Sequence, residues 1–318
     1  MKLKIKIALL FFTLVFSLGY AQTRDHSAKT VLAIETYAFL KGQDAALKAV
    51  ASQFPALRSQ TEAADKKLED SFGRAESNIR HYLRDELGAA HYRILERRLD
   101  SLLHLELKNP IAQQKQAEDF LKLLHQRTYF LQDTVLDKAI ASFTYHDAPH
   151  EEIIDGHVQI FNTDGHPKAE DAAVKIPIPK SWLVQEAQMP QTIKQFTSFH
   201  GKGLEKIILM SFELPSEYKN IPLDKNLIAE IISPQAALLR TEALQMDGRP
   251  AMMAEIEENI NGSMKIRMLQ FMFMLDGRLY CLQGSIGPVD EARNLGPHLK
   301  KYEPLFRLVA STTDMDTY

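Results

Sequence analysis

The first half of the chain has the hydrophobic periodicity of amphipathic helices. From Ser27 to about Ala141, apolar residues recur three or four positions apart, as they do along one face of a helix. The clearest run is Leu68, Phe72, Ala75, Ile79, Leu83 and Leu87. We expect a first helix from Ser27 to Leu40, ended by Gly42, and a break at Asn109-Pro110. Four or five helices with short connections indicate an antiparallel bundle.

The second half changes to the period of two that is typical of strands. Its last part holds four strand-like runs, Ala236–Met246, Pro250–Ile260, Met264–Leu275 and Arg278–Ile286. Asp247-Gly248, Asn261-Gly262 and Asp276-Gly277 separate these runs, and such dipeptides accept the positive φ angles of tight hairpins. Three in succession predict an antiparallel meander. Because Leu269–Leu275 is apolar almost throughout, we expect helices on both faces of the sheet.

Other segments complete an α+β fold, with an N-terminal helical bundle followed by a twisted antiparallel β-sheet flanked by helices. We expect strands at Val158–Phe161 and Leu204–Leu214, a helix at Leu223–Ile232 and a closing helix from Pro288. Val174–Pro179 contains two prolines, which favour an edge strand or an extended lead-in. The predicted parts are therefore a signal peptide (1–21), a helical domain (22–142), a linker (143–173) and an α+β domain (174–318).

The N-terminus has the three parts of an export signal. Lys2, Lys4 and Lys6 precede the apolar stretch Ile7–Leu18, and small residues lead to a cleavage site between Ala21 and Gln22. Twelve apolar residues are too few for a span, which takes about 20. No later segment has 18 consecutive apolar residues. We therefore expect an exported protein, periplasmic or secreted, whose mature chain has no transmembrane span.

The composition is that of a folded protein and excludes several kinds of binding site. The 318 residues are 45% hydrophobic and 25% charged, as in ordinary folded proteins. Loss of the three leader lysines lowers the net charge from −3 to −6, which gives no electrostatic case for nucleic-acid binding. A single cysteine excludes an internal disulfide framework and multi-cysteine metal sites. Cys281 lies in the apolar run Leu279–Leu282, so we interpret it as a core thiol.

The order of several short motifs resembles a known family. These motifs are Ile176-Pro177-Ile178-Pro179-Lys180-Ser181-Trp182, Gly248-Arg249-Pro250-Ala251, Gly277-Arg278-Leu279-Tyr280, Gly284-Ser285 and Phe306-Arg307-Leu308-Val309-Ala310-Ser311. Over roughly Val174–Thr312 the chain is similar to the Mog1/PsbP-like superfamily. That family includes photosystem extrinsic subunits, a Ran-binding protein, bacterial envelope proteins and secretion chaperones. The resemblance implies binding rather than catalysis and transfers no active-site residue. The chain departs from the pattern at Leu183–Gln191, where no clear hairpin is visible.

The linker gathers side chains of the kind that bind zinc. They are His146, Asp147, His150, Glu151, Glu152, Asp155, His157, Asp164 and His166. Pro149 prevents a helix that would align His146 with His150, so a polar linker explains the cluster. Asn162-x-Asp164-Gly165 lacks the later acidic ligand of a calcium loop, and His200-Gly201-Lys202-Gly203 lacks the spacing of a phosphate loop. We interpret the latter as a tight turn into the next strand, and we expect no cofactor.

Methionine is concentrated in the meander. Seven of the eleven methionines fall between Met246 and Met274. Met264, Met268, Met272 and Met274 have even spacing, so strand alternation places them on one face. Three interpretations stay open: core packing, an adaptable apolar groove for a peptide or lipid, and a Cu(I) site made of thioethers.

Absence of a catalytic motif and the family resemblance together favour a non-enzymatic function. We expect an exported binding or accessory module of the bacterial envelope that engages a protein or an apolar ligand. The alternative is an exported hydrolase with a histidine–carboxylate site near the linker. A third possibility is an architectural envelope protein that associates through its helical half.

Overall fold

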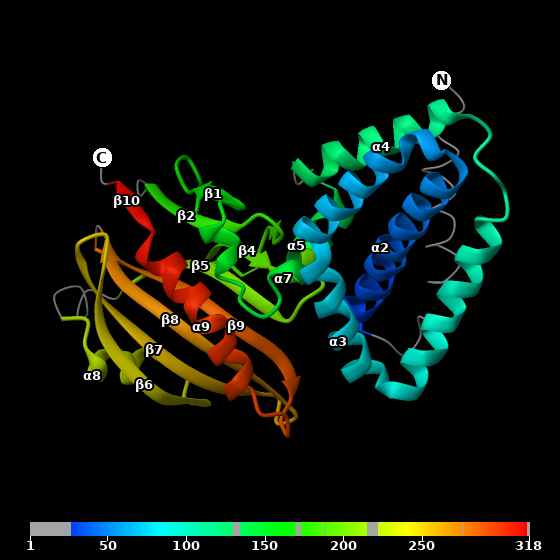
Figure 1. Ribbon diagram of the computed structural model, residues 1–318. Coiled ribbons are helices and arrows are strands. Elements are labelled where there is room, and N and C mark those ends of the chain that lie inside the picture. The colour runs from blue at the N-terminus through cyan, green and yellow to red at the C-terminus, as the bar shows by residue number, and fades with distance from the viewer. Residues whose placement is uncertain are drawn as a thin grey trace. The chain divides into compact units, whose positions relative to one another are not determined.

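The computed structural model describes residues 27–129, 134–169, 173–187, 189–214, 222–275 and 277–316 (Figure 1). The predicted signal peptide, with Ala21 and Gln22 at its cleavage site, lies outside the described residues. The described chain confirms the α+β class and divides into two compact units between His146 and Asp147. None of its helices has the length and hydrophobicity needed to cross a bilayer.

The first unit is helical. Its elements are α2 (Ala28–Gln53), the 3₁₀ turn η1 (Pro55–Leu57), α3 (Arg58–Glu106), α4 (Gln114–Tyr129) and α5 (Val135–Thr144). The side chain of Ser27 caps α2 by accepting a hydrogen bond from the backbone N–H of Thr30, as an N-cap serine should. The helix α3 is kinked at Gly88, whose φ of 73° is in the left-handed region. The first unit is thus a set of packed helices, as the periodicity predicts.

The end of the first helix was predicted wrongly. The expected stop at Gly42 does not exist, and α2 continues without a break to Gln53. Gly42 itself is buried. A glycine inside a helix costs only about 1 kcal/mol relative to alanine, which burial of Leu40, Leu47 and Val50 on the same helix outweighs.

The second unit contains the strands. Its elements in chain order are α6 (Glu151–Ile154), β1 (Val158–Asn162), β2 (Ala173–Pro179), β3 (Leu183–Gln185), β4 (Thr192–Thr197), α7 (Ser198–Gly201), β5 (Glu205–Glu213), α8 (Lys225–Ile231), β6 (Ala236–Met246), β7 (Arg249–Ile260), β8 (Met264–Leu275), β9 (Arg278–Asp290), α9 (Gly296–Ser311) and β10 (Asp314–Asp316). A small sheet has the order β1-β2-β10, and a seven-stranded sheet has the order β3-β4-β5-β9-β8-β7-β6. Every pair of neighbouring strands is antiparallel.

The predicted meander is present as β6 to β9. Asp247 and Gly248 have φ angles of 47° and 71°, and Asn261 and Gly262 have 54° and 67°. Both dipeptides thus have two positive φ angles, which suits the right-handed twist of the flanking strands. Gly277 also has a positive φ, of 75°, while Asp276 lies outside the described residues.

Three further expectations about strands need correction. The strand β2 is the middle strand of its sheet, not an edge, but β10 pairs only with its Ala173–Lys175 portion. Pro177 and Pro179 therefore lie where β2 has one neighbour, so neither proline interrupts a second ladder. An antiparallel pair, β3 with β4, exists where no hairpin was expected, because β3 is too short to show a period. Finally, β9 continues through Pro288 and α9 begins only at Gly296.

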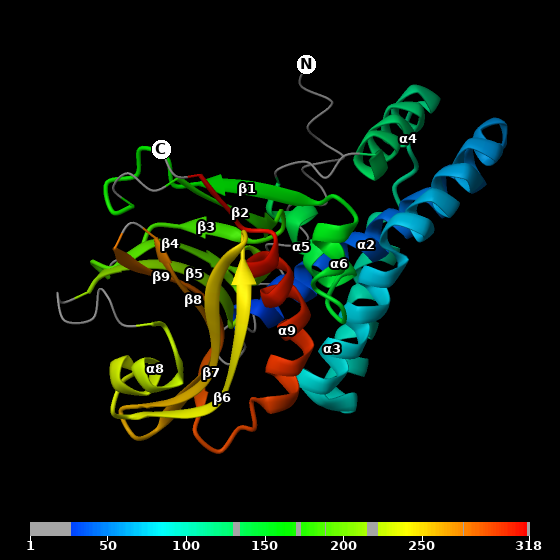
Figure 2. The ribbon, with the colours of Figure 1, turned by 90° about the vertical axis from the view of Figure 1, so that its left-hand side faces the viewer.

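The seven-stranded sheet has a helix and a cluster of buried apolar side chains on each face, as the apolar strand β8 predicts (Figure 2). We call them the α9 face and the α8 face. The α9 face includes Leu269, Phe271 and Phe273 of β8 and packs against α9 and the small sheet. The α8 face includes Met268 and Met272 of β8 and packs against Ile228 of α8. Figure 2 shows α8 and α9 on opposite sides of β6 and β7.

Candidate functional site

The histidines and carboxylates of the predicted linker are not brought together into a metal site. No group of three or more His, Cys, Asp or Glu side chains in the described ranges could hold a metal ion. Glu152 is instead buried, and its carboxylate accepts two hydrogen bonds from Ser181 at 2.7 Å, one from the backbone N–H and one from the hydroxyl. Asp147 forms an ion pair with Lys301 at 3.8 Å. These residues hold the second unit together.

Burial makes the carboxyl of Glu152 a weaker acid than usual. Removal from water raises the pKa of its carboxyl to about 7, and the two hydrogen bonds from Ser181 offset only part of this effect. The side chain is 2% exposed, so it contacts no bulk solvent. Burial thus moves the titration of this carboxyl to near neutral pH.

A second buried polar group fastens α9 to the sheet. Glu205 of β5 accepts hydrogen bonds from the hydroxyl of Ser198 and from Tyr302 of α9, and it lies 2.7 Å from Nε2 of His298. Burial raises the pKa of Tyr302 well above its ordinary value. Phe199, on the turn after β4, has a φ of 49°, and this left-handed turn positions Ser198 against Glu205. The cluster is an anchor: Ser198, Glu205 and Tyr302 are at most 2% exposed.

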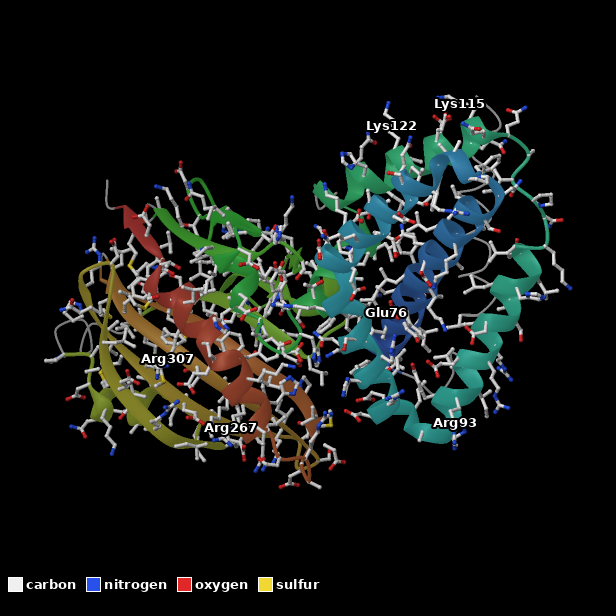
Figure 3. The ribbon with its side chains drawn as sticks, in the orientation of Figure 1. Glu76, Arg93, Lys115, Lys122, Arg267 and Arg307 are labelled. Atoms are coloured by element: carbon white, nitrogen blue, oxygen red, sulfur yellow. The ribbon has the colours of Figure 1, made fainter. Side chains whose placement is uncertain are left out.

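Charged residues on the α9 face also pair with one another. Glu255 of β7 accepts hydrogen bonds from Arg240 and Arg267, at 3.0 Å and 2.9 Å for their Nε atoms. Arg307 of α9 bonds to Glu242 and Glu303. Figure 3 shows Arg267 and Arg307 beside α9. Because each of these cations has carboxylate partners, the network is structural and offers no unpaired charge.

The four singled-out methionines are placed mainly as strand alternation predicts. Met268 and Met272 are buried on the α8 face, and Met274 packs half-buried against them. Met264 lies beyond an irregularity in the β8–β9 register and is 36% exposed. Met210 and Met252, from β5 and β7, extend the thioether surface of this face. The α8 face is therefore rich in methionine over several strands.

Strand β5 gives the α8 face a half-exposed stripe. Its residues alternate strictly: Glu205, Ile207, Leu209 and Ser211 are buried toward the α9 face. Lys206, Ile208, Met210 and Phe212 are half-buried toward the α8 face. The stripe thus begins with one cation and continues with three apolar side chains. Its apolar part is about 14 Å long at roughly 3.4 Å per residue.

Glutamines from four strands lie in register beside this stripe. The row across the sheet is Gln185, Gln195, Ile208, Gln283 and Gln270. Nε2 of Gln195 donates to Oε1 of Gln185, and Nε2 of Gln270 donates to Oε1 of Gln283 at 2.9 Å. Within the described chain, the amide nitrogens of Gln185 and Gln283 have no protein acceptor. These N–H groups are available to a ligand.

Two more polar groups stand beside the amide row. Lys206 pairs in register with Ser285 and Thr197, and among the residues that the structure describes it forms no ion pair or hydrogen bond. The hydroxyl of Ser285 is fully buried without a hydrogen-bond partner. An unsatisfied buried hydroxyl costs about 1–3 kcal/mol, and Ser285 is enclosed by protein rather than open to a ligand on the surface.

The sequence analysis singled out the methionines but not Lys206 or the amide row. The alternation of β5 was readable, since Lys206, Ile208, Met210 and Phe212 are spaced by two. The continuous apolar appearance of Ile207–Met210 hid it. The amide row had no local signal, because β5 pairs not only with the preceding strand β4 but also with β9, which lies four strands later in the sequence.

Comparisons with known proteins find a likeness only at the level of structure. No family model matches the sequence, and no curated protein matches it. Among solved structures, the chain is similar to cyanobacterial PsbP (CyanoP) from Synechocystis, with 16% identity and a TM-score of 0.36 over 50% of this chain and 93% of that one.

Two further solved structures match about half of this chain. One is LpqN from Mycobacterium tuberculosis, described as involved in cell envelope biogenesis, with 12% identity and a TM-score of 0.33 over 53% of this chain and 96% of that one. The other is a putative regulator of unknown function from Pseudomonas aeruginosa, with 12% identity and a TM-score of 0.28 over 49% and 96%. Likenesses this distant say nothing about what the chain binds.

Proposed function

We propose that this protein is an exported, non-enzymatic binding module that engages an apolar ligand through the α8 face of its seven-stranded sheet. The observation that carries the proposal is the incomplete cover of that face. In the described chain, the only helix against it is α8, which has seven residues. Met210, Phe212 and Met274 stay half-buried on a sheet whose opposite face is packed by a sixteen-residue helix.

Methionine suits this task. Its side chain is unbranched and polarisable, so it adapts to ligands of different shape more easily than leucine or isoleucine does. An apolar surface that remains partly accessible in a folded monomer commonly marks a binding site. The buried carboxylates support the non-enzymatic part, because Glu152 and Glu205 hydrogen-bond to other protein groups and are at most 2% exposed.

A neutral apolar dye tests the binding surface. We expect Nile red to bind saturably to the full chain and Met210→Gln to weaken the binding several-fold, because a polar amide replaces a half-buried thioether. Met189→Gln is the control, since Met189 is 67% exposed and lies outside this face. Circular dichroism checks that both variants fold. Equal dye binding by both variants would contradict the assignment of the surface.

Export and absence of catalysis have their own tests. Expression with the leader in a bacterial host should release a protein that begins at Gln22, as intact-mass measurement reports. A panel of ester, glycoside and peptide substrates should show no turnover. Turnover abolished by a single substitution in the second unit would overturn the non-enzymatic assignment and favour the hydrolase.

A further inference from the structure

The geometry points to one ligand class for the α8 face: a single-chain amphiphile with a carboxylate head, such as a long-chain fatty acid. The head lies at Lys206, and the chain follows β5 over Ile208, Met210 and Phe212. This inference rests on the proposed function, because it names the ligand for the same surface.

The head position follows from charge. Three rows of paired residues cross the sheet at Lys206, at Ile208 and at Met210. Lys206 is the only charged residue in these rows, and their other members are amides, hydroxyls, the thiol of Cys281 and apolar side chains. A cation without a partner among the described residues attracts an anion. The neighbouring strand β9 adds an uncharged donor that suits a carboxylate oxygen, the amide nitrogen of Gln283.

The tail position follows from length and polarity. The apolar part of the stripe, from Ile208 to Phe212, spans about 14 Å. One acyl chain spans about 15 Å, half the thickness of a bilayer's hydrocarbon core. Leu279, Cys281 and Met272 form the buried floor beside the stripe. The ligand would therefore cover the exposed sides of three apolar residues and leave its head at the polar end.

Other occupants fit less well. An anionic ligand without a chain would leave Met210 and Phe212 uncovered. An uncharged apolar ligand would leave Lys206 desolvated without a counter-ion. In an extended peptide, side chains on one face repeat every two residues, about 6.8 Å apart. The glutamines of the amide row are spaced by the distance between strands, about 4.8 Å, so they do not match that repeat.

Isothermal titration with sodium hexadecanoate, below the concentration at which it forms micelles, tests the inference. We expect one saturable site per chain. Sodium acetate should not bind, and 1-hexadecanol should bind roughly tenfold more weakly, because it lacks the charge that pairs with Lys206. Sodium octanoate should also bind roughly tenfold more weakly, because its tail leaves about four methylenes' length of the stripe uncovered, each buried methylene contributes about 0.8 kcal/mol, and the stripe buries only one side of the chain.

Two variants separate the charge from general effects. Lys206→Met keeps the apolar stem and should weaken hexadecanoate binding about tenfold while leaving 1-hexadecanol binding unchanged. Lys300→Met removes an exposed lysine from α9, on the other side of the sheet, and should change neither affinity.

Three results would overturn the inference. The first is equal hexadecanoate affinity in Lys206→Met and the unsubstituted protein. The second is equal affinity for hexadecanoate and 1-hexadecanol. The third is sedimentation with phosphatidylglycerol vesicles without binding of free hexadecanoate, which would identify a membrane surface as the ligand. If Nile red binds but hexadecanoate does not, the proposed function stands and the fatty acid is wrong.

Discussion

Replacement of Glu152 by glutamine should remove a pH dependence from the stability of the second unit. The carboxyl is buried, and its pKa is raised from 4.5 to about 7 in the folded protein. Each unit of pKa shift corresponds to about 1.4 kcal/mol, so the group alone lowers the free energy of unfolding by about 3 kcal/mol at high pH.

The direction follows from proton binding. Because the folded-state pKa is above the unfolded one, the folded state holds the proton more tightly between pH 4.5 and 7. The stabilisation from this proton is complete below pH 4.5, is lost as the pH rises toward 7, and is absent above it. Glutamine keeps both contacts with Ser181, since its amide oxygen accepts the backbone N–H and its amide nitrogen donates to the hydroxyl.

Urea unfolding followed by tryptophan fluorescence measures this effect. Trp182 is the only tryptophan, is 3% exposed and directly follows Ser181, so its fluorescence reports the unfolding of the second unit. At pH 4.5 the Glu152→Gln variant should match the unsubstituted protein, and at pH 8.5 it should be more stable by about 3 kcal/mol. The exposed Glu291→Gln is the control, which should show no such difference. A difference that does not change with pH would refute the reasoning.

Three other predictions concern packing, pairing and reactivity. Gly284→Ala should destabilise the second unit by about 1–3 kcal/mol in the same urea assay, because a Cβ there would lie 2.2 Å from the ring of Phe306. An unchanged free energy of unfolding would mean that α9 does not pack closely on β9. Glu255→Gln should cost about 2 kcal/mol, since it leaves two arginines without their shared carboxylate, and an equal loss from Glu291→Gln would count against that cause. Cys281 should react with a thiol reagent only after unfolding, because it is 2% exposed and burial raises the pKa of its thiol; rapid labelling of the native protein would contradict its position in the core.

Local patterns predicted the parts of the fold that depend on neighbouring residues. Aspartate-glycine and asparagine-glycine pairs fix hairpins within four residues, so the order β6 to β9 could be read along the chain. The apolar sequence of β8 predicted that side chains pack on both faces of its sheet. Phe271 and Met272 do pack on opposite faces.

The features that the sequence did not reveal depend on residues far apart in the chain. Glu152 meets Ser181, 29 positions later, and Tyr302 reaches Glu205 from the last helix. Neither contact can be predicted from neighbouring residues, because a charged residue in a polar segment is expected to be exposed to solvent. The left-handed turn at Phe199 is likewise imposed by packing, since non-glycine residues rarely adopt it unaided.

Methionine methyl NMR tests the central claim most directly, because the chain carries methionines on both faces of the sheet. In protein labelled with ¹³C at the methionine methyl groups, titration with hexadecanoate should shift the signals of the α8-face residues Met210, Met272 and Met274. The signals of the α9-face residues should stay in place; these are Met246, Met253 and Met315. Shifts confined to the α9-face methionines, or no shift at saturating ligand, would contradict a binding surface on the α8 face.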